Sequence, residues 1–297
     1  MACLVLAAVL GKVEAQSLPK EQLLWGKRLE DNPVVYAGGE QVRQANVRDG
    51  SPSGKNRVFS HVAVPTYTIH RAPDAVATGV GVVICPGGGY VDVWLDREGH
   101  DLGLWLAERG VTALVLKYRT NSRGGDEKRQ YDWETYLPVV VADARESIAL
   151  LRRGAEELRL DPERIGIVGF SAGGHLAFSA GFGLSDENVP ITDTGNPNFV
   201  GLFYPWLWEG FEDVARARVI SPPTFIMNGG PDQVTPASKA VDLFKILLEK
   251  KVAGELHIFG KGDHGFDLGD ERGVSVPLWK VSFVAWLQDL GFFDAPN

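Results

Sequence analysis

Short apolar runs alternate with longer segments of helical periodicity along most of this chain, and that alternation constrains the fold more than any other feature. The runs are rich in valine, isoleucine and phenylalanine, which favour buried strands. They occupy residues 61–71, 79–86, 111–119, 164–170, 199–205, 224–230 and 255–260. The helical segments occupy residues 98–110, 136–158, 173–183, 236–251 and 274–291. This order predicts an α/β fold, in which helices cover both faces of a mostly parallel sheet.

Two segments near the start of the chain depart from this pattern. The run at 61–71 contains Pro65 and alternates polar with apolar residues, which is typical of an edge strand. The later runs are apolar throughout, as strands covered on both faces should be. Residues 38–57 are polar and rich in turn-forming residues, so we expect a loop or an extended lead-in to the sheet there.

The length of 297 residues and the hydrophobic content of 44% are sufficient for one large core. We expect a lead-in over residues 16–57 and a single folded domain over residues 58–297. The net charge of −8 argues against a nucleic-acid partner, because a phosphate-binding surface needs many lysines and arginines. No stretch reaches the roughly 18 consecutive apolar residues that a membrane span requires.

The first residues, "MACLVLAAVLGKVEA", are typical of a signal peptide over residues 1–15. An apolar run is followed by Val13-Glu14-Ala15, a cleavage-like pattern of small residues. The run has no lysine or arginine before it, which leaves a truncated leader or a buried strand open. The leader predicts a secreted or periplasmic protein.

The segment "GFSAGG", residues 169–174, places Ser171 between an apolar run and a helical segment. Taken alone the Gly-x-Ser-x-Gly pattern is a weak signal, but a strand-to-helix turn is where a nucleophile elbow must lie. Gly169 and Gly173 fit that turn, because neighbouring backbones come close to the serine and leave no room for a Cβ. We therefore expect Ser171 to be a nucleophile whose Oγ projects at the carboxyl edge of the sheet.

A serine nucleophile needs a neighbouring base and a carboxylate that orients that base. His264 follows the last strand in the loop "GKGDHGFD", whereas His257 lies within that strand. Asp232, in "NGGPDQVTP", follows another strand and would lie at the same edge. Its rivals Asp263 and Asp267 are too close to His264 in sequence to approach its Nδ1 comfortably. We expect Ser171, Asp232 and His264 to form a catalytic triad in that chain order.

The segment "CPGGGY", residues 85–90, ends an early strand with consecutive glycines. Their backbone N–H groups can approach a substrate closely, so we assign an oxyanion hole to the N–H groups of Gly88, Gly89 and Ala172. A phosphate-binding loop is the competing interpretation. It is excluded because no lysine follows in the required register and no G-x-G-x-x-G pattern is completed.

Together "CPGGGY", "GFSAGGHLA", "NGGPDQVTP" and "GDHGF" resemble the α/β-hydrolase superfamily over roughly residues 60–290. The closer resemblance is to bacterial secreted esterases described as xylanase or acetylxylan esterase, which are related to the hormone-sensitive-lipase-like and feruloyl-esterase-like branches. It implies a central sheet of about eight strands, no cofactor, and a structural role for His175 beneath the elbow. Pro86 departs from the lipase branch, where histidine often precedes the glycines, and this puts the loop conformation in question.

Aromatic residues follow the glycine loop and a later strand, and they are candidates for substrate binding because aromatic faces stack on sugars and acyl groups. They are Tyr90, Trp94, Tyr204, Trp206 and Trp208. For Trp206 and Trp208, structural packing is an equally good interpretation.

The resemblance implies a secreted serine carboxylesterase that removes acetyl or other small acyl groups from plant polysaccharides or their fragments. A prolyl-oligopeptidase-like peptidase and a catalytically silent binding protein are the alternatives. Glycosidic cleavage would need two carboxylates flanking the bond, and no such pair stands out. No histidine and carboxylate cluster has the spacing of metal ligands, so we expect no metal. The sequence leaves the oligomeric state open.

Overall fold

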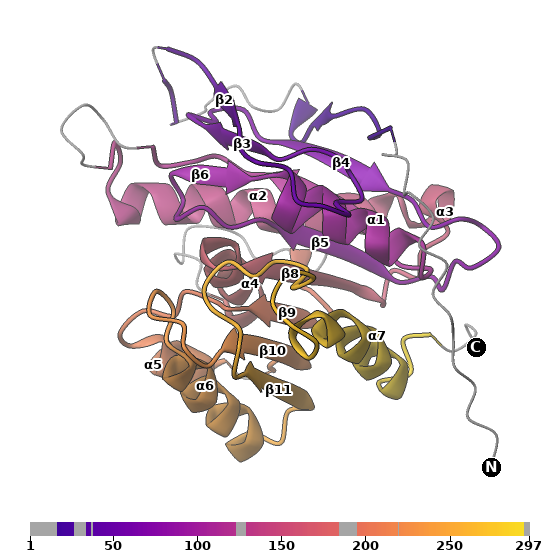
Figure 1. Ribbon diagram of the computed structural model, residues 1–297, viewed down its shortest axis with the longest axis vertical. Coiled ribbons are helices and arrows are strands. Elements are labelled where there is room, and N and C mark those ends of the chain that lie inside the picture. Colours follow the sequence, from indigo (N-terminus) through magenta and orange to yellow (C-terminus); the bar gives the residue numbers. More distant parts are fainter. Residues whose placement is uncertain are drawn as a thin grey trace.

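The computed structural model describes residues 17–26, 34–36, 38–122, 129–183, 195–218 and 220–293. The predicted signal peptide, residues 1–15, lies outside the described residues. The described chain forms an α/β structure with a large twisted sheet at its centre (Figure 1).

The large sheet has eight strands in the order β1-β4-β7-β5-β8-β9-β10-β11. β1 and β4 pair antiparallel, and β4 pairs antiparallel with β7, whereas all later pairings are parallel. The strands are β1 (Gln22–Leu23), β4 (Thr66–His70), β5 (Gly81–Cys85), β7 (Thr112–Lys117), β8 (Ile165–Phe170), β9 (Val200–Phe203), β10 (Thr224–Gly229) and β11 (Gly254–Phe259). The predicted mostly parallel sheet is confirmed.

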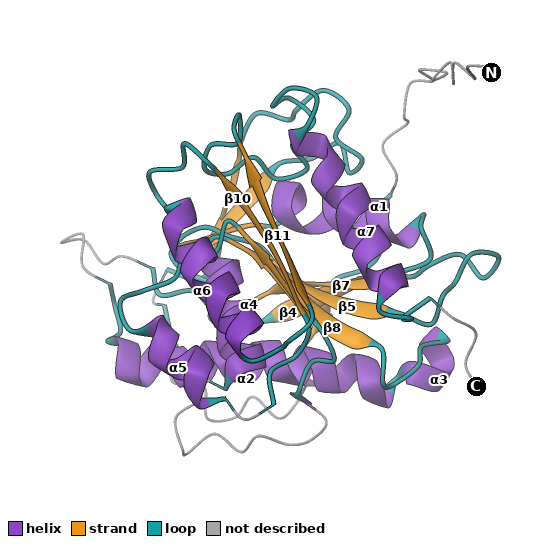
Figure 2. Cartoon of the chain, turned by 90° about the horizontal axis from the view of Figure 1, so that it is seen from below, coloured by secondary structure: helices purple, strands orange, loops and turns teal. Residues whose placement is uncertain are grey.

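The five central parallel strands are buried along their whole length because helices cover both faces of the sheet. In Figure 2, α1 and α7 lie on one face, and α2, α4 and α6 lie on the other. The helices are α1 (Asp101–Ala107), α2 (Trp133–Arg153), α3 (Ala155–Leu158), α4 (Ala172–Phe182), α5 (Phe211–Ala217), α6 (Ala237–Glu249) and α7 (Trp279–Asp289).

The expectation of an edge strand at 61–71 is wrong in two respects. The strand begins at Thr66, after Pro65, because proline cannot donate a hydrogen bond to a neighbouring strand. It also lies second from the edge, since the two residues of β1 pair with its outer side. β1 lies in the polar lead-in and is too short to give a sequence signal.

The interpretation of residues 38–57 as a loop or an extended lead-in is also incomplete, because part of this segment belongs to a second sheet. Its three antiparallel strands are β2 (Gln41–Gln44), β3 (Arg57–Ser60) and β6 (Asp92–Trp94), in that order. β6 follows the glycine loop directly. The small sheet therefore connects the lead-in to the region where the catalytic residues were expected.

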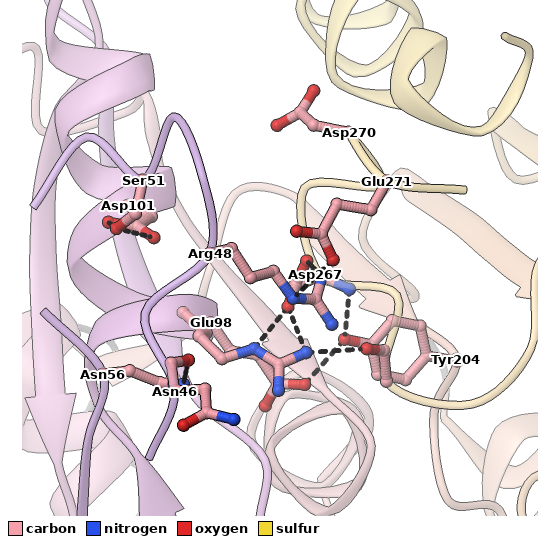
Figure 3. A network of polar contacts seen from close by, with 12 residues as sticks. Asn46, Arg48, Ser51, Asn56, Glu98, Asp101, Tyr204, Asp267, Asp270 and Glu271 are labelled. Carbon is pink, nitrogen blue, oxygen red and sulfur yellow. Dashed lines mark hydrogen bonds and ion pairs between the residues drawn. The ribbon is translucent and has the colours of Figure 1, made fainter. Parts of the chain in front are cut away.

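Residues 45–56, which we call the β2–β3 loop, are attached to the large domain by polar contacts between distant residues (Figure 3). Arg48 Nη1 donates to Asp267 Oδ1 at 2.6 Å. Ser53 N donates to Asp101 Oδ1 at 2.8 Å, and Ser51 Oγ donates to Asp101 Oδ2 at 2.9 Å. These bonds fix the loop beside the carboxyl edge of the sheet.

The attachment through Asp101 predicts that stability depends on pH. Burial raises the pKa of the Asp101 carboxyl from 3.8 to about 6, although the bonds from Ser53 and Ser51 oppose the rise. The folded protein therefore binds a proton at Asp101 between these pH values that the unfolded chain does not bind. The contribution of Asp101 to the free energy of unfolding falls as pH rises through this window, by about 3 kcal/mol at most.

Urea unfolding of the wild type and of Asp101→Asn at about pH 4 and pH 7 tests this prediction. The stability of the wild type relative to the variant should fall by about 2 to 3 kcal/mol between the two pH values. Asp289→Asn, which changes an exposed carboxylate at the end of α7, is the control. The prediction would be contradicted if the wild type and Asp101→Asn differed in their free energy of unfolding by the same amount at both pH values.

Candidate active site

Ser171 lies in the sharp turn between β8 and α4, with a backbone φ of 51°. The turn requires both glycines beside it. A Cβ on Gly169 would lie 2.0 Å from the carbonyl oxygen of Gly173, and a Cβ on Gly173 would lie 2.0 Å from the carbonyl oxygen of Cys85. The positive φ of a non-glycine residue is a strained conformation that concentrates at functional sites. The turn has the geometry of a nucleophile elbow.

Three loops bring together the side chains that were expected to form a triad. Ser171 Oγ lies 3.0 Å from His264 Nε2, and His264 Nδ1 lies 2.9 Å from Asp232 Oδ2. Ser171 follows β8, Asp232 follows β10 and His264 follows β11, so all three lie at the carboxyl edge of the sheet. This arrangement allows His264 to accept the Ser171 proton while Asp232 fixes the ring.

Asp232 is surrounded by hydrogen-bond donors. Its Oδ1 accepts from the N–H groups of Val234 at 2.8 Å and Thr235 at 2.9 Å. Its Oδ2 accepts from Thr235 Oγ1 at 2.7 Å, in addition to facing His264. Burial alone would raise the pKa of Asp232, but the bonds from His264 and Thr235 outweigh it and lower the pKa. The carboxylate is therefore ionised at neutral pH.

The rival histidines and carboxylates occupy other positions. Asp263 accepts from the backbone N–H of His264, and Asp267 pairs with arginines. His257 Nε2 lies 2.8 Å from Glu255 on β11. His175 is buried beneath the elbow, where its Nδ1 lies 2.6 Å from Tyr90 Oη, and burial lowers its pKa to about 3. A buried neutral His175 agrees with the structural role that the sequence resemblance implied.

The glycine loop between β5 and β6 lies beside Ser171. Gly88 and Gly89 have φ values of 132° and 63°, and a Cβ on Gly88 would lie 2.1 Å from the carbonyl oxygen of Asp92. Among the described residues, no acceptor takes the N–H group of either glycine. Ala172 is the first residue of α4, so its N–H group has no acceptor within the helix. The three N–H groups of the predicted oxyanion hole are therefore free to bind a substrate oxygen.

Glu98 supports this loop, and sequence reasoning missed it. It lies in the π-helical turn η2 (Asp96–His100) and accepts from Gly87 N and from Tyr204 Oη, both at 2.6 Å. Burial raises its pKa, although these two bonds oppose the rise. A sequence signal was weak, because Glu98 stands at the start of a helical segment where acidic residues are common.

A pocket of about 430 Å³ opens over Ser171. Its lining includes Ser171, His264, two glycines of the glycine loop, Trp94 and three arginines. The lining residues are Arg48, Gly88, Gly89, Trp94, Arg97, Glu98, Ser171, Val234, His264, Gly265 and Arg272. We call this the catalytic pocket. Its volume is within the range of small-molecule sites, and Trp94 lies where the sequence placed it, on the pocket wall.

The other predicted substrate-binding aromatics are not on this wall. Tyr90 and Tyr204 have 0% exposure, so the prediction that they contact substrate is wrong. Both have positive φ and turn inward, where the hydroxyl of Tyr204 binds Glu98 and that of Tyr90 binds His175. Trp206 and Trp208 are half-buried and pack against His175, each with a ring-centroid distance of 4.8 Å.

Comparisons with known proteins show which families and proteins this chain resembles. The BD-FAE family model matches residues 102–198. An acetylxylan esterase of Xylanibacter ruminicola is 27% identical over 72% of this chain and 45% of its own length. An endo-1,4-beta-xylanase B of Butyrivibrio fibrisolvens is 25% identical over 73% of this chain and 37% of its own length. The chain thus spans less than half the length of these curated relatives.

Solved structures share the fold. An acetyl ester-xyloside bifunctional hydrolase from Caldicellulosiruptor lactoaceticus has a TM-score of 0.69 at 24% identity, covering 93% of this chain and 98% of its own. A propionate-bound esterase, Est2, from Thermogutta terrifontis has a TM-score of 0.63 at 22% identity, covering 87% of this chain and 97% of its own. The chain therefore has the α/β-hydrolase fold and resembles serine esterases of that fold, the acetylxylan esterases among them.

Proposed function

We propose that this chain is a serine carboxylesterase that hydrolyses acetyl or other small acyl esters through an acyl-enzyme on Ser171. The observation that carries the proposal is the continuous line of hydrogen bonds from Ser171 Oγ through His264 to Asp232, with distances of 3.0 Å and 2.9 Å. A serine hydroxyl becomes a nucleophile when an oriented base removes its proton.

In the first half of the reaction, Ser171 Oγ attacks the ester carbonyl carbon while His264 Nε2 takes the serine proton. The carbonyl oxygen becomes negative and binds the N–H groups of Gly88, Gly89 and Ala172. The C–O bond to the alcohol then breaks, and the proton on His264 passes to the departing alcohol. In the second half, a water molecule loses a proton to His264 and attacks the acyl group. The carboxylic acid leaves, and Ser171 Oγ recovers the proton.

For the substrate we propose acetylated fragments of a plant polysaccharide of the xylan type. The relative from Xylanibacter ruminicola is named an acetylxylan esterase, and the structure from Caldicellulosiruptor lactoaceticus is described as an acetyl ester-xyloside hydrolase. The leader pattern in residues 1–15 supports a secreted or periplasmic enzyme, which would meet such a substrate. The structure has no helix among its described residues that is long and apolar enough to cross a membrane.

A panel of 4-nitrophenyl esters with released acids identified tests the proposal. Of the described residues that line the catalytic pocket, only Trp94 and Val234 have large apolar side chains. A long acyl chain therefore finds little apolar surface, and we expect kcat/KM to be at least about tenfold lower for octanoate than for acetate. Cleavage of dipeptidyl 4-nitroanilides without ester hydrolysis would show a peptidase instead. Absence of labelling by a fluorophosphonate would show a catalytically silent protein with the hydrolase fold.

A further inference from the structure

A second hollow of about 410 Å³ adjoins the catalytic pocket and has no part in the mechanism described above. It lies between the β2–β3 loop and β6, and most of its lining residues are polar or charged. The lining residues are Ala45, Asn46, Val47, Arg48, Asp49, Asn56, Trp94, Arg97 and Glu271. Arg48, Trp94 and Arg97 also line the catalytic pocket, so the two hollows share a wall. A group held in the second hollow could thus remain attached to an ester at Ser171.

The shared wall is held in place by the protein itself. Arg48 Nη1 and Arg97 Nε each donate to the buried Asp267 at 2.6 Å. On the opposite side Asn56 is 2% exposed, and its Nδ2 donates to the carbonyl oxygen of Asn46 at 2.5 Å. Figure 3 shows Asn46 and Asn56 gathered on one side of Arg48, with Asp267 and Glu271 on the other. The hollow is therefore preformed, which reduces the entropy lost on binding.

The lining of this second hollow offers donors and acceptors together. The guanidinium groups of Arg48 and Arg97 donate, whereas the carboxylates of Asp49 and Glu271 accept. Both guanidinium groups already pair with Asp267, and Arg48 Nε also lies 3.3 Å from Glu271 Oε2, so these cations are neutralised within the protein and the lining favours a neutral ligand over an anion. The side chains of Asn46 and Asp49 are exposed on this lining, so their amide and carboxylate groups are accessible to a ligand held in the hollow.

We propose that this second hollow, lined by Asn46, Asp49 and Asn56, binds the alcohol part of the ester as a neutral glycosyl unit. Hydroxyl groups both donate and accept, so a sugar matches this lining better than an alkyl or aryl alcohol does. The proposal rests on the proposed esterase function and assigns the sugar to the β2–β3 loop. Specificity for a carbohydrate ester then comes from the lead-in, and the chemistry comes from the large domain.

The test compares two substrates on the double variant Asn46→Ala/Asp49→Ala. Both side chains are exposed, and no described residue bonds to either, so the fold should be retained. The kcat/KM for acetylated xylo-oligosaccharides should fall about tenfold or more, since two hydrogen bonds to the sugar are removed. The kcat/KM for 4-nitrophenyl acetate should change less than about twofold, because its aryl group makes no such bonds. Gln288→Ala/Asp289→Ala, an exposed amide and carboxylate pair on α7, is the matched control.

The sugar-site proposal would be overturned if Asn46→Ala/Asp49→Ala lost kcat/KM equally on both substrates. It would also be overturned if the variant lost no kcat/KM on the sugar ester. A wild type that hydrolyses 4-nitrophenyl acetate but no acetylated sugar would also overturn it, while the serine esterase proposal would stand. A wild type that hydrolyses neither ester would overturn both proposals.

Discussion

Replacing Ser171 by alanine is expected to lower kcat for 4-nitrophenyl acetate by about 10⁵-fold. The variant lacks the proposed attacking atom, Ser171 Oγ, which lies 3.0 Å from His264 Nε2. The oxyanion N–H groups and the pocket would remain, so a small residual rate above that of water is expected. Alanine retains the Cβ and the φ of 51°, so the elbow carries the same strain and the free energy of unfolding should change little.

The matched control for this variant is Ser179→Ala, in α4, the helix that follows Ser171. The hydroxyl of Ser179 donates to the carbonyl oxygen of His175 at 2.8 Å and lies away from the pocket lining. The control should keep wild-type kcat and its labelling by a fluorophosphonate, whereas Ser171→Ala should lose both. Substantial esterase activity in folded Ser171→Ala would exclude the acyl-enzyme at this residue.

The sheet and the grouping of Ser171, Asp232 and His264 could be predicted because both depend on strand order. The carboxyl ends of parallel strands lie at the same edge of a sheet. Residues in the loops that follow β8, β10 and β11 are therefore brought together at that edge. A second, local signal is Gly169, where a Cβ would meet the backbone of Gly173 four residues later. Such features require no knowledge of packing between distant segments.

The pocket wall could not be predicted, because it depends on contacts between residues far apart in the chain. Tyr204 and Trp94 are both aromatic residues that follow a loop or strand near the site. Tyr204 has a positive φ and its side chain points into the core toward Glu98, which the sequence pattern does not predict. Arg48 and Asp267 are separated by 219 residues. The strands of the small sheet have three or four residues, too few for a periodic signal.

Replacing Asp232 by asparagine is expected to lower kcat by about 10⁴-fold while the fold is kept. The reason lies in the donors around the carboxylate. Oδ1 accepts two backbone N–H groups, from Val234 and Thr235, so the asparagine NH₂ group cannot occupy that side without leaving both unsatisfied. The NH₂ group must therefore take the place of Oδ2 and face His264 Nδ1 at about the 2.9 Å seen here.

A donor at that position holds His264 in the tautomer whose Nδ1 is an acceptor and whose Nε2 carries the proton, and such a ring cannot accept the Ser171 proton. The loss should therefore appear in kcat for 4-nitrophenyl acetate with little change in KM, and circular dichroism should show native structure. Asp263→Asn is the matched control, since among the described residues that carboxylate accepts only from the backbone N–H of His264. This variant should retain kcat within about threefold. If the two variants lost activity equally, Asp263 and Asp232 would share the orienting role. The proposal that Asp232 alone orients His264 would then be wrong.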